Sequence, residues 1–76
     1  MLNAETPTIE VFKTSIETIQ SAQAVIQQLN NLFPLLRITI DLDDCDRILR
    51  IEGTLVAVHT IIENVNLLGH SCEMLE

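Results

Sequence analysis

The hydrophobic positions of this chain change period along its length, and each change marks a new element. Residues 8–14 alternate between apolar and polar, which predicts a strand. From 16 to 31 the apolar residues recur every three or four positions, which predicts an amphipathic helix that Pro34 ends. The apolar stripe predicted for this helix is Ala22, Val25, Ile26, Leu29 and Leu32.

A second strand, turn and strand follow the proline. Residues 36–42 alternate strictly, with four aliphatic side chains predicted to face the core, and residues 47–51 form another short apolar run. Between them lie the polar residues 43–46. Two such runs joined by a short polar segment predict a β-hairpin.

The last third of the chain predicts a helix and a final strand. Helical spacing runs over about 55–68, with Thr54 as the expected N-terminal cap and Gly69 as the residue that ends it. The predicted apolar stripe is Leu55, Val58, Ile61, Ile62, Val65 and Leu68, and His59 falls on the polar side. Residues 71–75 alternate again and predict a short strand.

The predicted order is β-α-β-β-α-β. One antiparallel four-stranded sheet with two helices on one face buries every apolar stripe, which is the ferredoxin-like arrangement of the α+β class. We expect residues 1–7 to form a flexible N-terminal leader and residues 8–76 to form a single domain.

Composition narrows the possible functions. The chain has 76 residues, 47% of them apolar, and a net charge of −7. An acidic balance disfavours nucleic acid and anionic membrane surfaces, because both need a basic patch. The first residues do not resemble a signal peptide and no apolar run is long enough to span a membrane, so a soluble, cytoplasmic protein is expected. No nucleophile–base set or phosphate loop stands out, so we do not expect an enzyme.

Several segments in the correct order resemble the heavy-metal-associated domains, which include small copper chaperones and modules of cation pumps. The segment 35–42, Leu-Leu-Arg-Ile-Thr-Ile-Asp-Leu, resembles the family's V-x-x-V-x-V-D-L strand. The segment 46–53, Asp-Arg-Ile-Leu-Arg-Ile-Glu-Gly, resembles a D-K-I-L-x-V-E-G run of some bacterial members. Ile16 matches the buried position before the metal loop, and residues 69–72 match the G-Y-x-A position. The resemblance covers about residues 9–75 and implies the same fold.

The metal motif of that family is where this sequence departs from it. The family binds soft metal ions through M-x-C-x-x-C at a helix N-terminus, where the dipole and the metal both lower thiol pKa values. Thr18 and Ser21 stand where the resemblance places the two cysteines. Neutral hydroxyls are poor ligands for a soft ion, so the metal site is not expected here. Ordinary helix capping by these residues is the preferred interpretation, and a hard ion or a phosphate is the alternative.

Other residues leave a second possibility for metal binding. Cys45, His70 and Cys72 are expected near the same end of the molecule, where they could serve as relocated copper or zinc ligands. Cys72 alternates with Met74 and is expected to be buried, whereas Cys45 is expected to be exposed. Because the second and last strands are expected at opposite edges of the sheet, a disulfide between the two cysteines is not expected.

The hairpin turn concentrates acidic residues. Asp41, Asp43, Asp44, Asp46 and Glu52 superficially imitate a calcium loop. The central glycine of such a loop is missing and strands flank it, so a solvated acidic face is the preferred interpretation. Such a face could also steer a basic partner.

These observations predict a non-enzymatic binding or regulatory module that acts through protein–protein contacts, with no cofactor. The partner is expected to be another protein or a second copy of the chain. Exposed edge strands and an apolar patch containing Phe12 and Phe33 are the expected contact surfaces. The alternative is a copper- or zinc-binding protein that uses Cys45, His70 and Cys72.

Overall fold

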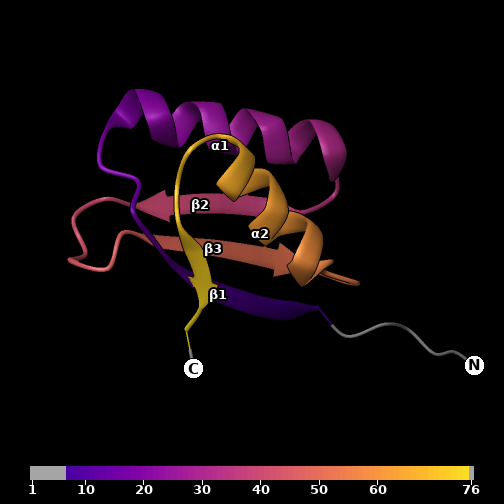
Figure 1. Ribbon diagram of the computed structural model, residues 1–76. Helices are drawn as coiled ribbons and strands as arrows, with labels where there is room; N and C mark the ends of the chain where they lie inside the picture. The colour runs from indigo at the N-terminus through magenta and orange to yellow at the C-terminus, as the bar shows by residue number, and fades with distance from the viewer. Residues whose placement is uncertain (1–6, 76) are drawn as a thin grey trace, which may run out of the picture.

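A computed structural model describes residues 7–75, so the predicted leader, apart from Pro7, and Glu76 lie outside the described residues. The elements follow the predicted order (Figure 1). They are β1 Thr8–Thr14, α1 Ile19–Leu32, β2 Arg37–Asp41, β3 Ile48–Gly53, α2 Val58–Leu67 and β4 Cys72–Met74.

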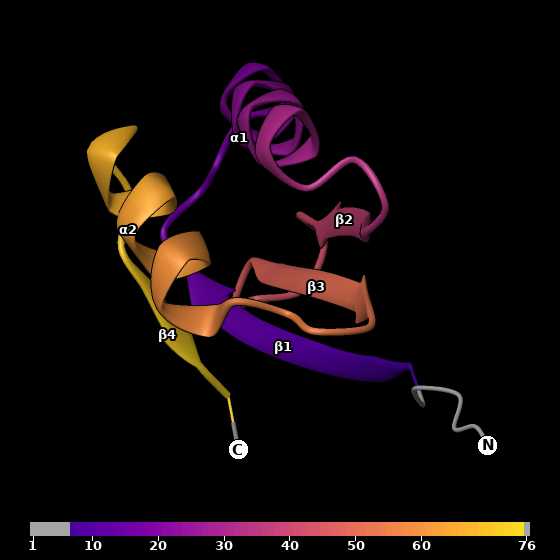
Figure 2. The same ribbon diagram turned by 90° about the vertical axis from the view of Figure 1, so that its right-hand side faces the viewer.

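The four strands form one antiparallel sheet in the order β2-β3-β1-β4. Both helices cover the same face of this sheet, and the opposite face is left open (Figure 2). The predicted α+β class and four-stranded antiparallel sheet are therefore confirmed, and the arrangement is consistent with a ferredoxin-like fold. The second and fourth strands are the two edges, as expected.

The core lies between the helices and the covered face of the sheet. It is built almost entirely from aliphatic side chains, so packing there depends on branched shapes rather than aromatic stacking. The buried apolar residues are Phe12, Ile16, Ala22, Val25, Leu29, Ile38, Leu49, Ile51, Ile61, Val65 and Cys72.

Phe12 belongs to this core and not to a surface patch, which corrects one prediction. Its side chain is fully buried and it pairs in register with Leu49, another buried residue. Because side chains alternate along a strand, Ile9 and Val11 face the open side of the sheet. Phe33 is half-buried and packs against the edge of the core, so it remains available for part of a surface.

Helix α1 begins three residues later than predicted. Thr18 has extended backbone and its hydroxyl accepts a hydrogen bond from Ser21 N–H, which makes it the N-cap. Ile16 precedes the helix and is fully buried, so its apolar character reflects the core rather than the helical stripe. The prediction that Leu32 belongs to the buried stripe is wrong, because this residue is exposed in the last turn.

Helix α2 is shorter than predicted, and Thr54 does not cap it. Strand β3 continues to Gly53, and the helix begins at Val58 after Ala57, which makes no side-chain capping bond. The connecting turn places Leu55 in a left-handed conformation (φ 57°) with its side chain 80% exposed, so Leu55 is not part of the buried stripe. Leu68, predicted in that stripe, is also exposed. Gly69 follows with φ 94°, as expected for a residue that ends a helix.

Within residues 7–75, no helix combines the length and the apolar character that crossing a membrane requires.

Candidate functional site

Three connections meet at one end of the molecule, and we call this region the loop end: residues 15–18, 42–47 and 69–71. Thr14 N–H, at the end of β1, donates to Asp46 O in the hairpin turn (3.1 Å). On the other side, Ser15 N–H donates to Ser71 O (3.3 Å), and Ser71 N–H donates to Ser15 Oγ (2.9 Å). The prediction that these loops share one end is confirmed.

Thr14 holds the loop end together from inside. It is the buried polar residue of the described chain, and its hydroxyl donates to Arg47 O at 2.6 Å. The same oxygen accepts a hydrogen bond from Ile16 N–H at 3.2 Å. One buried hydroxyl therefore joins β1, the hairpin turn and the segment that leads into α1. Sequence reasoning missed this role, because its partner in the turn lies 33 residues away along the chain.

Thr18 and Ser21 stand at the N-terminus of α1, where the resemblance places metal-binding cysteines. The Thr18 hydroxyl is occupied by the capping bond from Ser21 N–H at 3.0 Å, so the capping interpretation is confirmed for Thr18. Ser21 takes part through its backbone, in the first turn of the helix. Both residues therefore serve the start of the helix in this structure.

Two of the acidic residues at the turn, Asp41 and Asp44, have a structural task. Asp41 Oδ1 accepts a hydrogen bond from Asp43 N–H (3.0 Å), and Asp44 Oδ1 accepts one from Asp46 N–H (2.8 Å). Each carboxylate thus bonds to the backbone two residues ahead, which is the reason that Asp favours turns. Arg47 ends the turn in a left-handed conformation (φ 49°), and its guanidinium donates to Leu42 O at 2.9 Å.

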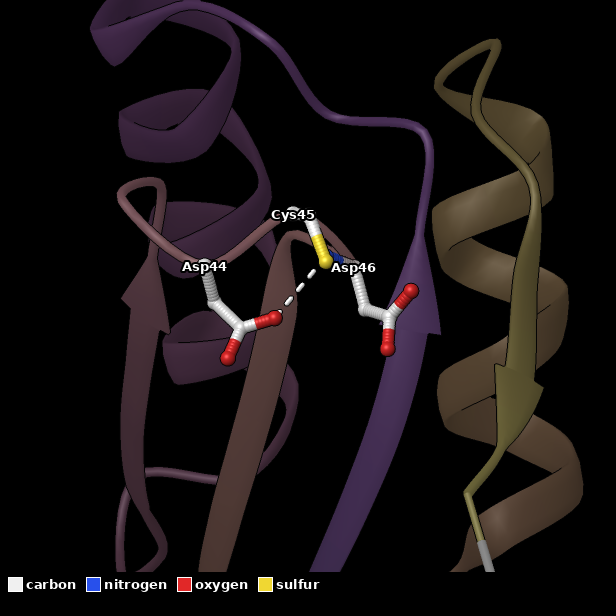
Figure 3. A group of neighbouring side chains, drawn as sticks. All are labelled: Asp44, Cys45 and Asp46. Atoms are coloured by element: carbon white, nitrogen blue, oxygen red, sulfur yellow. Dashed lines mark hydrogen bonds between the residues drawn. The ribbon is translucent and has the colours of Figure 1, made fainter.

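One group of potential metal ligands lies in this turn. Oxygen and sulfur atoms of Asp44, Cys45 and Asp46 lie within 4.8 Å of one another (Figure 3). All three come from consecutive residues of an exposed turn, and the Asp44 carboxylate already accepts a backbone hydrogen bond. Two carboxylates and a thiol combine hard and soft ligands, which is not the set that either copper or calcium prefers.

Cys72 is poorly suited to bind a metal ion or to act as a nucleophile. It is buried in β4, opposite Thr14 of β1. Its burial, and then the charge of Glu73, raises the pKa of the Cys72 thiol from 9.0 to about 11. The thiolate is the form that binds metal and attacks electrophiles, and the raised pKa keeps this cysteine in the protonated thiol form near neutral pH.

The relocated ligands predicted from sequence do not meet as a set of three. Cys45 is exposed in the turn, His70 is half-buried beside the end of α2, and Cys72 is buried in β4. Among residues 7–75, the three-residue ligand group within 4.8 Å is the one in the turn, and it includes only Cys45 of these residues. Both cysteines are free, in agreement with the prediction that they form no disulfide.

A second feature lies near the start of β2, where the chain leaves α1, and we call it the apolar hollow. It has a volume of about 210 Å³ and its lining carries no charged residue. The lining residues are Phe33, Pro34, Leu35, Leu36, Thr54 and Leu55. Leu35 is 95% exposed and Leu55 is 80% exposed, so two large aliphatic side chains stand in solvent around one depression.

Sequence reasoning found only part of this hollow. It singled out Phe33 as a surface candidate, but it assigned Leu55 to a buried helical stripe. The dipeptide Pro34-Leu35 was the available signal, because an apolar residue directly after a helix-ending proline falls in a turn. Leu35 and Leu55 come together at this hollow because β2 and β3 lie side by side. The sequence around either residue does not indicate this.

The open face of the sheet carries a different, charged depression. Its volume is about 460 Å³, and residues of β2 and β3 line it. Arg37 and Arg50 lie there beside Asp41 and Glu52. This surface therefore presents charges of both signs side by side.

We compared the chain with models of known protein families and with curated proteins, and neither comparison found a match.

Proposed function

We propose that this chain is a non-enzymatic protein-interaction module that uses the ferredoxin-like arrangement as a frame for surface contacts. The observation that carries the proposal is the apolar hollow, where Leu35 and Leu55 are 95% and 80% exposed around an uncharged depression. Single exposed leucines are common on protein surfaces, but a pair around a hollow is typical of an interaction site.

Backbone conformation supports this interpretation. Leu55 has a positive φ of 57°, a conformation that a leucine rarely adopts. Strained backbone tends to gather at binding sites, where the surrounding structure maintains it. Here the strain holds a large apolar side chain away from the core and beside Leu35, which favours contact with a partner over folding of the chain itself.

The chemistry of the hollow defines its ligand. A lining without charge fits an apolar segment of another protein, such as aliphatic side chains presented by a helix or a loop. Burying one leucine contributes about 1.5–3 kcal/mol, so the two leucines together contribute about 3–6 kcal/mol to such a contact. This energy corresponds to a change of about 100- to 10,000-fold in the dissociation constant.

Site-specific photo-crosslinking tests the proposal. A photoreactive amino acid replaces Leu35 in the chain produced in its host cells, and the captured proteins are identified. A matched chain carries the same group at position 67, because Leu67 is also apolar and 81% exposed but lies on α2, outside the hollow. We expect a protein that crosslinks at position 35 and not at position 67.

Affinity measurements with the purified partner then decide the role of the hollow. Leu35→Ser combined with Leu55→Ser is expected to weaken binding at least 100-fold, whereas Leu67→Ser leaves it unchanged. Equal crosslinking at positions 35 and 67, or unchanged affinity in the double variant, contradicts the proposal.

A further inference from the structure

The free edge of β2 is a second surface, separate from the apolar hollow. Among residues 7–75, β2 forms one edge of the sheet and pairs with β3 alone. An edge strand leaves a row of backbone N–H and C=O groups without partners in the sheet, and another strand can bind to them. The pattern of hydrogen bonds in the sheet shows which groups of β2 these are.

The hydrogen bonds of β1 show which of its residues direct their backbone groups toward β3 and which toward β4. Thr14 N–H donates toward the β3 side, to Asp46 O, whereas Val11 O accepts from Leu75 N–H on the β4 side. Backbone groups alternate in direction along a strand. The even-numbered residues of β1 therefore bond to β3, and the odd-numbered residues bond to β4.

The register of each strand pair extends this alternation from β1 through β3 to β2. Even-numbered residues of β1 pair with odd-numbered residues of β3, for example Phe12 with Leu49, so the even-numbered residues of β3 bond to β2. These pair with the odd-numbered residues of β2, for example Arg50 with Thr39. The N–H and C=O groups of Ile38 and Ile40 consequently point to the free edge.

The sequence of β2 is complementary to itself in an antiparallel pair. It reads Arg37-Ile38-Thr39-Ile40-Asp41, with a cation at one end, an anion at the other and a polar residue at the centre. If two copies pair about a two-fold axis through Thr39, Arg37 of each copy lies opposite Asp41 of the other. Ile38 lies opposite Ile40 of the second copy, and these are the residues whose backbone groups are free.

This register satisfies backbone and side chains together. Each Ile38–Ile40 pair exchanges both of its backbone hydrogen bonds. The Arg37–Asp41 pairs fall at the non-hydrogen-bonded positions, where Cα atoms lie closest, at about 4.5 Å. Opposite charges directly across such a pair are favourable, and like charges are unfavourable.

The flank of α1 beside this edge carries the isoleucines Ile19 and Ile26, with the polar residues Gln23 and Asn30 next to them. Gln28 Nε2 donates to Asn64 Oδ1 (3.2 Å), which places Gln28 on the side of α1 that faces α2. At about 100° per residue, Ile19 lies on the opposite side of the helix, with Ile26 close to it. Ile19 is 68% exposed, although it belongs to a helix of the folded chain.

This flank of α1 and the edge of β2 face the same direction. α1 packs over β2 and α2 packs against β4, so the side of α1 away from α2 is the side of the β2 edge. Figure 2 shows α1 above β2 at this side of the sheet, away from α2. A second copy paired along β2 therefore brings its own α1 flank toward this one and covers Ile19.

We infer that a second copy of this chain pairs with it along β2, in the register centred on Thr39, to form a continuous eight-stranded antiparallel sheet. The charge complementarity of Arg37 and Asp41 in this register identifies the partner, and the exposed Ile19 beside the edge adds an apolar contact. The apolar hollow lies beyond the strand, so both copies keep it available for another protein.

A charge-reversal series tests the inference on the full chain. The oligomeric state is measured by analytical ultracentrifugation over a wide range of concentrations. Wild type is expected to dimerise reversibly. Arg37→Asp places like charges opposite each other twice and is expected to weaken the dimer about 10- to 100-fold. Adding Asp41→Arg to the first change reverses both ends of the strand, restores opposite charges and is expected to restore dimerisation.

Two further measurements distinguish a lost interface from a misfolded variant. Circular dichroism checks that each variant is folded, and amide exchange locates the interface, with Ile38 and Ile40 expected to gain protection as concentration rises. Ile19→Lys is expected to weaken the dimer, whereas Leu67→Lys on α2 is the matched control. A monomer at all concentrations, a dimer that Arg37→Asp does not weaken, or protection confined to β4 overturns the inference. None of these results affects crosslinking at Leu35, so this inference and the proposed function can fail separately.

Discussion

Replacing Thr14 with valine tests whether the loop end depends on one buried hydroxyl. Valine has nearly the same shape as threonine, so the change removes two hydrogen bonds and leaves the volume almost unchanged. The bonds lost are Thr14 Oγ1–H to Arg47 O and Ile16 N–H to Thr14 Oγ1. The second matters more, because the bond from Ile16 N–H is buried, whereas the bond to Arg47 O is only partly buried.

The magnitude follows from that buried donor. An unsatisfied buried N–H costs about 1–3 kcal/mol, whereas the partly buried Arg47 carbonyl can regain a bond from water. We therefore expect the free energy of unfolding to fall by about 1–3 kcal/mol. In a chain of this size each kcal/mol corresponds to about 4–8 °C, so the midpoint of thermal unfolding is expected to fall by about 5–20 °C.

Thermal and urea unfolding followed by circular dichroism measure the effect. Thr8→Val is the matched control, because Thr8 lies in the same strand and also donates to a backbone carbonyl, that of Gly53, but in an exposed position. Water replaces an exposed bond, so the control is expected to change stability by less than about 0.5 kcal/mol. Equal effects of the two substitutions, or an unchanged midpoint for Thr14→Val, would refute the reasoning.

Other substitutions test other parts of the account. Thr18→Ala removes the cap of α1 and is expected to cost about 1 kcal/mol in urea unfolding, whereas Ser21→Ala, which keeps the backbone donor, is expected to have little effect. Gly53 has a φ of 155°, which L side chains rarely adopt, and a Cβ there would also press on Leu36 Cδ2. Gly53→Ala is therefore expected to destabilise by about 1–3 kcal/mol, and stability equal to wild type would contradict this interpretation of the backbone. Since the pKa of the Cys72 thiol is raised from 9.0 to about 11, the folded chain keeps a proton that the unfolded chain loses. The free energy of unfolding should therefore fall as pH rises from about 9 to about 11, and Cys72→Ala should remove that part of the decline.

Much of the fold follows from hydrophobic periodicity. The strict alternation of residues 36–42 predicted a strand, and the structure confirms β2 as Arg37–Asp41. The error at α2 has a physical cause: Thr54 has the chemistry of a cap, but β3 runs to Gly53 and the turn places Leu55 at a positive φ. A leucine rarely adopts that conformation, so sequence patterns favoured a helix at this position.

Among the candidate sites, features that depend on neighbouring residues were predicted, and features that depend on distant segments were missed. Local chemistry predicted the capping role of Thr18 and the exposure of Cys45, because both depend on neighbouring residues. The apolar hollow and the buried role of Thr14 depend on contacts between distant segments, and periodicity carries no information about them. Phe12 was misplaced for a related reason, because one phenylalanine in an alternating strand does not reveal which face of the sheet the helices cover.

A titration of the reduced protein with Cu(I), followed by amide chemical shifts, tests the central claim most directly. The matched variant combines Thr18→Cys with Ser21→Cys, which places two thiols at the N-terminus of α1. We expect no saturable shift in wild type and stoichiometric binding by the variant, with shifts around residues 18–21. Saturable binding by wild type, with shifts at Cys45, His70 and Cys72 or at Thr18 and Ser21, would contradict it and would favour a metal-binding protein.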